Sequence, residues 1–239
     1  MNNWLKLENK TVIITGGASG IGKAVAQEFL NLGSNVVVCD MNPTQPVFDP
    51  APGKLLYVVT NVADRDSVQN MIDTTLEKFG NIDVLVNNAG INIPRLLVDP
   101  KDPEGEFELN EPVFSKVVDV NLKGVFLCAQ YAARQMVKQG HGVVINMSSE
   151  SGLEGSEGQS IYAATKNAVN SFTRSWAKEL GKLGVRVVGG APGILEATGL
   201  RRRSGQLSEV ADLVCYIASE RASYIHGVTY NIAGGKTRG

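Results

Sequence analysis

The sequence has few of the residues that usually bind metals or form redox centres. Its 239 residues include 3 cysteines and 2 histidines. Cys39, Cys128 and Cys215 stand apart, without metal or redox spacing. We therefore expect no metal site, and three buried free thiols in a reducing compartment. His141 and His226 each adjoin a glycine, so we expect turn residues rather than ligands.

A charge excess and a long apolar run are also missing. The formal net charge is -1, which gives no general attraction to nucleic acid or to an anionic membrane. Residues 1–6 lack the apolar core of a signal peptide, and no run approaches membrane-spanning length. With 43% hydrophobic and 20% charged residues, we expect a single cytoplasmic domain over residues 1–239.

A glycine-rich turn between a strand and a helix is the first motif that the sequence does contain. The β-branched run Thr11–Thr15 predicts a strand, and apolar residues from Ile21 to Leu32 recur at helical spacing. Glycines let the backbone approach a pyrophosphate, and free amides at the start of a helix favour its negative charge. The turn therefore predicts a dinucleotide phosphate site made by Gly16, Ser19, Gly20, Ile21 and Gly22.

A carboxylate ends the second predicted strand, Asn35–Asp40. Asp40 follows the glycine turn by roughly twenty residues, where a ribose-binding acid is expected. A carboxylate there accepts hydrogen bonds from the ribose hydroxyls of NAD and repels the 2′-phosphate of NADP. No Lys or Arg adjoins Gly20 or Asp40 to bind that phosphate. A solvated strand-end Asp is the alternative, but the position favours NAD.

Further strands and helices alternate along the chain, which predicts parallel βαβ units in an α/β fold. The predicted strands are Leu55–Thr60, Ile82–Val86, Val143–Ser148, Val185–Val188 and Val228–Ile232. The predicted helices are Ser67–Phe79, Val113–Lys138, Ile161–Leu183 and Leu207–Ala218.

A tyrosine and a lysine lie four residues apart in the predicted helix Ile161–Leu183. Tyr162 and Lys166 therefore project from one face, where a fixed ammonium favours ionisation of a neighbouring phenol. Ser149 follows a predicted strand, at the carboxyl end where open α/β sheets bind ligands. Together the three side chains predict proton transfer to or from a substrate hydroxyl. An ordinary amphipathic pair on a solvated helix is the alternative for Tyr162 and Lys166.

Six motifs, in order along nearly the whole chain, resemble those of the short-chain dehydrogenases/reductases. They are Thr15-Gly16-x-x-x-Gly20-x-Gly22, Asn88-Ala89-Gly90, Asn121 within Val120–Gly124, Ser149, Tyr162-x-x-x-Lys166 and Pro192-Gly193. The resemblance implies a Rossmann-type, doubly wound parallel sheet of about seven strands with helices on both faces. It also implies a homotetramer, in which Val113–Lys138 and Ser160–Leu183 form a subunit contact.

The resemblance further implies a catalytic tetrad of Asn121, Ser149, Tyr162 and Lys166. Tyr162 would be the acid/base, and Ser149 would polarise the substrate oxygen. Lys166 would hold the nicotinamide ribose and assist Tyr162, while Asn121 would position a proton-relay water. The other expected NAD contacts are Met41, Asn61, Val62, Asn88, Ala89, Gly90, Pro192, Gly193 and Ile194. Relatives often have Asp where Asn61 stands, which puts the strength of the adenine contact in doubt.

Three segments more narrowly resemble family members that act on a sugar or polyol phosphate. They are Asn92–Leu97, Ser148–Gly155 and Leu195–Leu200. A phosphosugar needs cations at the mouth of the site, for which Arg95 and Arg201–Arg203 are candidates. Its hydroxyls need acceptors, for which Glu150 and Glu154 are candidates. Ordinary solvated surface is the alternative for all of them, and the loop Ile91–Pro112 is either a specificity loop or a surface insertion.

Two other functions stay open at this point. One is a reductase of acyl or other small ketones, since a fold does not fix a substrate. The other is a dinucleotide-sensing protein without turnover, against which the intact tetrad argues.

The connection at 194–206 is short for the family, which usually carries a lid of two short helices there. Here the connection contains three adjacent arginines, Arg201–Arg203, and little apolar surface to cover a ligand. We therefore expect that lid residues are missing from the printed sequence at this point. A true deletion is the alternative.

Overall fold

The chain folds around one parallel sheet. The computed structural model describes residues 4–102, 104–193 and 205–235. Within them, seven strands pair in the order β3-β2-β1-β4-β5-β6-β7. The strands are β1 Thr11–Thr15, β2 Asn35–Asp40, β3 Lys54–Val59, β4 Val84–Asn87, β5 Gly142–Met147, β6 Val185–Pro192 and β7 Thr229–Ile232. The predicted Rossmann-type sheet is confirmed.

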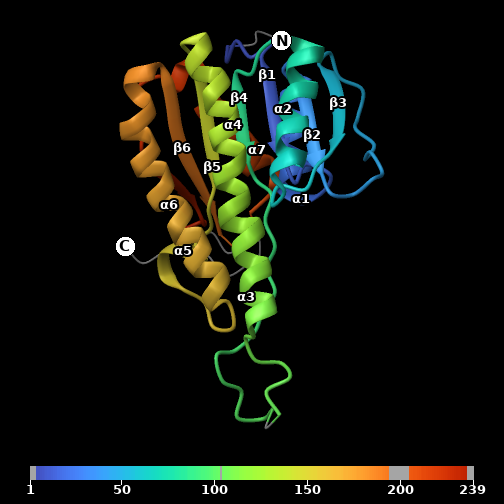
Figure 1. The fold of residues 1–239 in the computed structure, drawn as a ribbon. Coiled ribbons are helices and arrows are strands. Elements are labelled where there is room, and N and C mark those ends of the chain that lie inside the picture. The colour runs from blue at the N-terminus through green and yellow to red at the C-terminus, as the bar shows by residue number, and fades with distance from the viewer. Residues whose placement is uncertain (1–3, 103, 194–204, 236–239) are drawn as a thin grey trace.

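Helices cover both faces of this sheet, with α2, α4 and α6 on one face and α1 and α7 on the other (Figure 1). The helices are α1 Gly20–Asn31, α2 Arg65–Phe79, α3 Glu111–Val118, α4 Gly124–Gln139, α5 Ser151–Glu154, α6 Ser160–Leu180 and α7 Leu207–Ala218. No helix among the described residues is long and apolar enough to cross a membrane.

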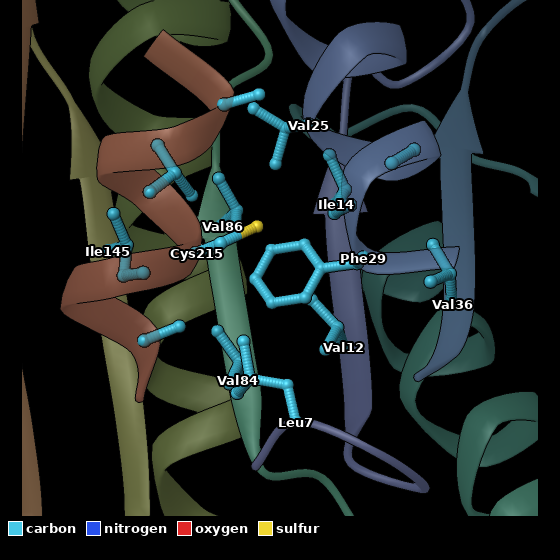
Figure 2. Close-up of a cluster of buried hydrophobic side chains, with 14 of the residues drawn as sticks. Leu7, Val12, Ile14, Val25, Phe29, Val36, Val84, Val86, Ile145 and Cys215 are labelled. Atoms are coloured by element: carbon cyan, nitrogen blue, oxygen red, sulfur yellow. The ribbon is translucent and has the colours of Figure 1, made fainter. Parts of the chain in front are cut away.

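Phe29 of α1 lies at the centre of the core on the α1 and α7 face (Figure 2). Its ring is fully buried among Val12 and Ile14 of β1, Val86 of β4 and Cys215 of α7. Every residue of β1 and β4 is buried, because helices pack on both faces of these central parallel strands. All three cysteines are buried and free, as predicted.

The predicted helix Val113–Lys138 is interrupted. After α3, residues Asp119–Lys123 form one π-helical turn, and α4 then begins at Gly124. A π turn inserts one extra residue into the helical register, and such turns often occur at functional sites. Asn121 lies in this turn and is fully buried. The apolar spacing predicted the helical segment but could not show the extra residue.

The loop between β4 and α3 extends away from the body, beyond the carboxyl ends of the strands (Figure 1). Its two sides meet at an isolated bridge between Leu96 and Glu108. The predicted lid connection at 194–206 lies outside the described residues except for 205 and 206. Ile194 and Arg201–Arg203 also lie outside them.

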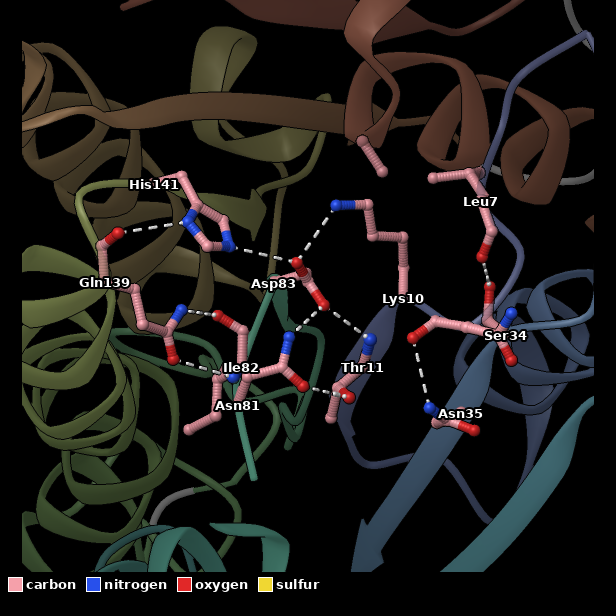
Figure 3. A network of polar contacts seen from close by, with 12 residues as sticks. Leu7, Lys10, Thr11, Ser34, Asn35, Asn81, Ile82, Asp83, Gln139 and His141 are labelled. Atoms are coloured by element: carbon pink, nitrogen blue, oxygen red, sulfur yellow. Dashed lines mark hydrogen bonds and ion pairs between the residues drawn. The ribbon is translucent and has the colours of Figure 1, made fainter. Parts of the chain in front are cut away.

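At the amino ends of the strands, the carboxylate of Asp83 joins β1, β4 and the turn before β5 (Figure 3). Its Oδ2 accepts hydrogen bonds from Thr11 N and Asn81 Nδ2, both at 2.8 Å. Its Oδ1 lies 3.2 Å from both Lys10 Nζ and His141 Nε2. Asp83 is buried, so these partners replace the water that a carboxylate otherwise binds.

Replacing Asp83 by Ala should destabilise the fold. The change leaves Thr11 N and Asn81 Nδ2 without their acceptor, which costs about 2–4 kcal/mol in the free energy of unfolding. Chemical denaturation measures it, with Asp212→Ala as the matched control because Asp212 is an exposed carboxylate on α7. An Asp83→Ala protein as stable as the Asp212→Ala protein would contradict this role.

Candidate active site

The site lies at the carboxyl edge of the sheet, where β1 and β4 send their connections in opposite directions. Open α/β sheets bind ligands at such a switch point. A cavity of about 450 Å³ follows β1 and β2, and one of about 350 Å³ follows β4 and β5. Both are lined by Ile21, Asn88, Gly90 and Ile91. They are therefore adjoining halves of one cleft.

Hydrogen bonds lock the turn after β1 to the turn after β4. Asn88 Nδ2 donates to Thr15 O at 3.0 Å and to Gly16 O at 3.1 Å. Thr15 Oγ1 accepts from Ala89 N at 3.0 Å. Gly16 has a φ of +63°, and a Cβ there would lie 2.8 Å from Ala89 Cα. Only glycine therefore allows the two turns to approach this closely.

The first half of the cleft has the features that a dinucleotide requires. Asp40 is on its wall, and its carboxylate is oriented by Ala18 N and Asn42 N, each at 3.1 Å. Ser19 at the start of α1 makes no side-chain cap, and no acidic residue lies in the first turn. The first amides of α1 are thus open to an anion. These residues fit a nicotinamide dinucleotide, whose ring accepts or gives up a hydride.

Most of the predicted cofactor residues lie on the cleft wall. In the first half these are Gly16, Ser19, Ile21, Gly22, Asp40, Met41, Val62, Asn88, Ala89 and Gly90. Pro192 and Gly193 line the second half. Gly20 and Asn61 line neither half, and Asn61 Oδ1 accepts from Ala63 N at 3.0 Å in a local turn. Thr60 and Val120, which the sequence did not indicate, are on the wall.

Lys166 is buried at the floor of the second half, only 4% exposed. Its Nζ donates to Met147 O at 2.8 Å, at the end of β5. Ser148 Oγ donates to Lys166 O at 2.9 Å, which fixes α6 against the same strand end. Burial lowers the pKa of Lys166 to about 8, because the ammonium is deprived of water.

Ser149 and Tyr162 line the same half of the cleft as Lys166. The Lys166 Nζ lies 5.7 Å from the centroid of the Tyr162 ring. Ser149 Oγ accepts from Ser151 N at 3.3 Å. This contact uses a lone pair of the Ser149 hydroxyl and leaves its proton available to a ligand oxygen.

Asn121 lies behind the wall rather than on it. Its Oδ1 accepts from Ile91 N at 2.8 Å, and its Nδ2 donates to Ile91 O at 2.9 Å and to Thr165 Oγ1 at 3.3 Å. Both amide donors are therefore engaged within the protein. The side chain holds the backbone of Ile91, which lines both halves of the cleft.

The three predicted substrate residues do not lie on the cleft wall. Arg95 Nη1 donates to Pro94 O at 2.9 Å, and its guanidinium lies 5.9 Å from the Phe107 ring. Glu150 is buried beside Gly193, and Glu154 is exposed on α5.

Asn92, Ser151 and Gln159 are polar wall residues that sequence reasoning missed. A signal existed for one of them. Gln159 precedes Tyr162 by three positions, which places both on one face at the start of α6.

The model of the short chain dehydrogenase family matches residues 10–207. The chain therefore belongs to the short chain dehydrogenase family, and it is an oxidoreductase that acts on CH–OH groups with a nicotinamide cofactor. It is 52% identical over 269 positions to a sorbitol-6-phosphate 2-dehydrogenase of Klebsiella pneumoniae, with 100% of both chains covered.

Two other relatives in the family are named for a different activity. A 3-oxoacyl-(acyl-carrier-protein) reductase of Thermotoga maritima is 38% identical over 252 positions, covering 97% of this chain and 99% of the relative. The corresponding reductase of Staphylococcus aureus is 36% identical over 248 positions, covering 95% and 97%. Relatives of this chain within one family thus have different named activities, so membership of the family does not fix the substrate.

The buried ammonium makes stability depend on pH in a way that Lys166→Met should remove. An unfolded lysine has a pKa near ~10.4, whereas the pKa of Lys166 is lowered to about 8. Between these values the unfolded state keeps a proton that the folded state has lost, so stability rises with pH. From about pH 7.5 to about pH 10.5, wild type should gain roughly 2–3 kcal/mol relative to Lys166→Met.

Chemical denaturation of both proteins at each pH measures this difference. Other groups titrate in both proteins, so their contributions to the free energy of unfolding cancel in the difference between wild type and Lys166→Met. A difference that stays constant or shrinks as the pH rises would show that the ammonium is not desolvated.

Proposed function

We propose that the protein interconverts sorbitol 6-phosphate and fructose 6-phosphate with NAD. The observation that carries this proposal is the 52% identity, over the whole of both chains, to the sorbitol-6-phosphate 2-dehydrogenase of Klebsiella pneumoniae. The cleft supports it, because Ser149, Tyr162 and Lys166 share one wall. A dinucleotide sensor without turnover would not need side chains that transfer a proton.

In this mechanism the substrate oxygen lies between Ser149 and Tyr162. During oxidation the deprotonated oxygen of Tyr162 would take the proton of the substrate hydroxyl, and a bound nicotinamide ring would accept the hydride from the carbon that carries this hydroxyl. The Ser149 hydroxyl, oriented by Ser151 N, donates to the oxygen as it becomes a carbonyl. Lys166 Nζ lies 5.7 Å from the centroid of the Tyr162 ring. Its ammonium would stabilise negative charge at Tyr162 during the proton transfer and would also hold the nicotinamide ribose.

Asn121 acts in this scheme through the backbone of Ile91. The two hydrogen bonds between Asn121 and Ile91 keep the turn after β4 against the cleft. A Cβ on Gly90 would lie 3.3 Å from Lys166 Nζ and 3.4 Å from Asn121 Oδ1. Asn121, Gly90 and Lys166 are therefore packed closely, which supports a positioning role for Asn121. A relay water bound at this turn remains part of the proposal.

The choice of NAD rests on Asp40. Its carboxylate is held at the rim of the first half of the cleft by Ala18 N and Asn42 N. There it can accept from ribose hydroxyls, and its charge repels a 2′-phosphate.

Asp40→Ala should therefore narrow the preference between the two cofactors. Wild type should use NAD at least about 100-fold better than NADP in kcat/KM, and the variant should reduce this ratio at least about tenfold, or about 1.4 kcal/mol. Initial rates with each cofactor measure the ratio. Asp73→Ala, an exposed carboxylate on α2, is the matched control. A wild type that prefers NADP would refute this role for Asp40.

The phosphate end of the substrate is proposed to approach Arg95. Arg95 N donates to Gly158 O at 2.7 Å, which ties its loop to the segment that precedes α6. Gly158 adjoins Gln159 on the cleft wall. This contact supports the proposal, because it keeps the Arg95 backbone beside the segment that leads to Gln159 and Tyr162.

Sorbitol 6-phosphate should be oxidised at least about tenfold better in kcat/KM than free sorbitol, because a charged contact to phosphate contributes about 1.5–3 kcal/mol. Absorbance of NADH follows both reactions. Equal rates on the two would refute the phosphate contact. Faster turnover of a 3-oxoacyl thioester than of fructose 6-phosphate would favour the second candidate, the reductase activity of the Thermotoga and Staphylococcus relatives.

We further propose a cytoplasmic homotetramer in which α4 and α6 contact a second copy. An apolar groove of about 490 Å³ runs along these helices and is lined by Phe126, Ala133, Val137, Trp176 and Leu180. Phe126 is 38% exposed within it, so burial against a second copy would remove apolar surface from water. Sedimentation velocity measures the assembly, and a monomer at micromolar concentration would refute it.

A lid at the connection 194–206 also stays a proposal. The alignment with the Klebsiella relative has 269 positions against the 239 residues of this chain, so 30 positions of that relative have no residue opposite them. Residues missing from the connection 194–206 would account for such a difference. The intact mass of the protein purified from its natural source tests it, since a mass of 25.5 kDa would mean a true deletion.

A further inference from the structure

A short chain of hydroxyl and amide groups runs along the wall of the second half of the cleft. Ser156 Oγ donates to Ser151 Oγ at 3.2 Å, and Ser151 Oγ donates to Gln159 Oε1 at 3.4 Å. Ser151 and Gln159 line the cleft, whereas Ser156 does not. The chain begins outside the cleft and ends at the side-chain amide of Gln159.

The backbone of Gln159 is fixed independently of its side chain. Gln159 N donates to Ser156 O at 3.1 Å, and Gln159 O accepts from Ala163 N at 2.8 Å. Gln159 occupies the position that caps α6, yet its side chain makes no cap hydrogen bond. The amide is therefore turned away from the helix it precedes and toward Ser151.

This arrangement determines which end of the amide is available. Ser151 Oγ accepts from Ser156, so its own proton goes to Gln159 Oε1. Among the residues that the structure describes, none accepts a hydrogen bond from Gln159 Nε2. The two amide protons are thus left for a ligand in the cleft that Tyr162 also lines.

We infer that Gln159 reads a hydroxyl group next to the reacting carbon of the substrate, and that Ser151 and Ser156 hold its amide in the donating orientation. The inference rests on the proposed function, since it assumes a substrate with a hydroxyl beside the carbonyl. A ketose phosphate has such groups at C1 and C3, whereas a 3-oxoacyl thioester has none. Glu150 and Glu154 were predicted to bind substrate hydroxyls, but neither lines the cleft wall. Gln159 would bind a substrate hydroxyl instead.

A donor held in place by its own hydrogen bonds discriminates strongly. A hydroxyl that meets it needs no reorganisation of the protein, and a substrate without the hydroxyl leaves the amide desolvated and unpaired. Gln159 and Tyr162 lie three positions apart at the start of α6, and both side chains line the same half of the cleft. The contact therefore also orients the reacting carbon relative to Tyr162.

The test combines one variant with substrates that lack single hydroxyls. Gln159→Met keeps the length of the side chain and removes the amide. The reduction of fructose 6-phosphate, 1-deoxyfructose 6-phosphate and 3-deoxyfructose 6-phosphate by NADH is followed for wild type and variant. Ser160→Ala is the matched control, because Ser160 is the exposed next residue and lies off the cleft wall.

Gln159→Met should lower kcat/KM for fructose 6-phosphate at least about tenfold. For one of the two deoxy analogues the same change should cost less than about threefold, because the contacted hydroxyl is already absent. The melting temperature and the Kd for NADH should stay at wild-type values. An equal loss on all three substrates, or no loss on any, would overturn the inference.

Wild-type turnover of fructose 6-phosphate tests the proposed function separately. If wild type instead reduces another hydroxylated ketone, deoxy analogues of that ketone test Gln159 in the same way. If it reduces only ketones without a neighbouring hydroxyl, both the proposed function and the role of Gln159 are wrong.

Discussion

The burial of one ammonium group is the constraint on which the site depends. Lys166 is 4% exposed and donates to Met147 O at 2.8 Å. Burying an ammonium group costs folding free energy, because the charge loses its contact with water. The same loss lowers the pKa of Lys166 to about 8. The core between β5 and α6 has to be rigid enough to keep it there. Ser148, bonded to Lys166 O, contributes to this rigidity.

The same strand ends position the rest of the cleft. The parallel sheet brings the turns after β1, β4 and β5 to one edge, and buried polar contacts then set their spacing. Asn88 joins the first two turns, and Asn121, which lies in the π turn, accepts a hydrogen bond from Ile91 N. At the other edge of the sheet, Asp83 fixes the starts of β1 and β4. The residues that form the cleft therefore lie at the carboxyl ends of the strands, and the Asp83 network that stabilises the fold lies at their amino ends.

Much of the fold could be predicted from the sequence, because β-branched runs and helical apolar spacing are local signals. The glycine turn was visible because a strand and a helix flank it, and the Tyr162 and Lys166 pair because the other family motifs accompany its spacing. Other features depend on contacts between distant segments. The π turn at Asn121 keeps the apolar spacing of an ordinary helix, and the Asn61 side chain is used in a local turn with Ala63. Gln159 is set by a hydroxyl chain that only the folded loop forms.

We propose that Tyr162 moves the proton, and that the cleft binds the dinucleotide without help from the Tyr162 hydroxyl. Tyr162→Phe removes one hydroxyl and keeps the ring that lies 5.7 Å from Lys166 Nζ. Turnover and NADH binding, measured on the same preparation, separate the two functions. Turnover should fall about a thousandfold or more, while the Kd for NADH should change less than about threefold. Turnover near the wild-type rate, with NADH binding intact, would contradict it.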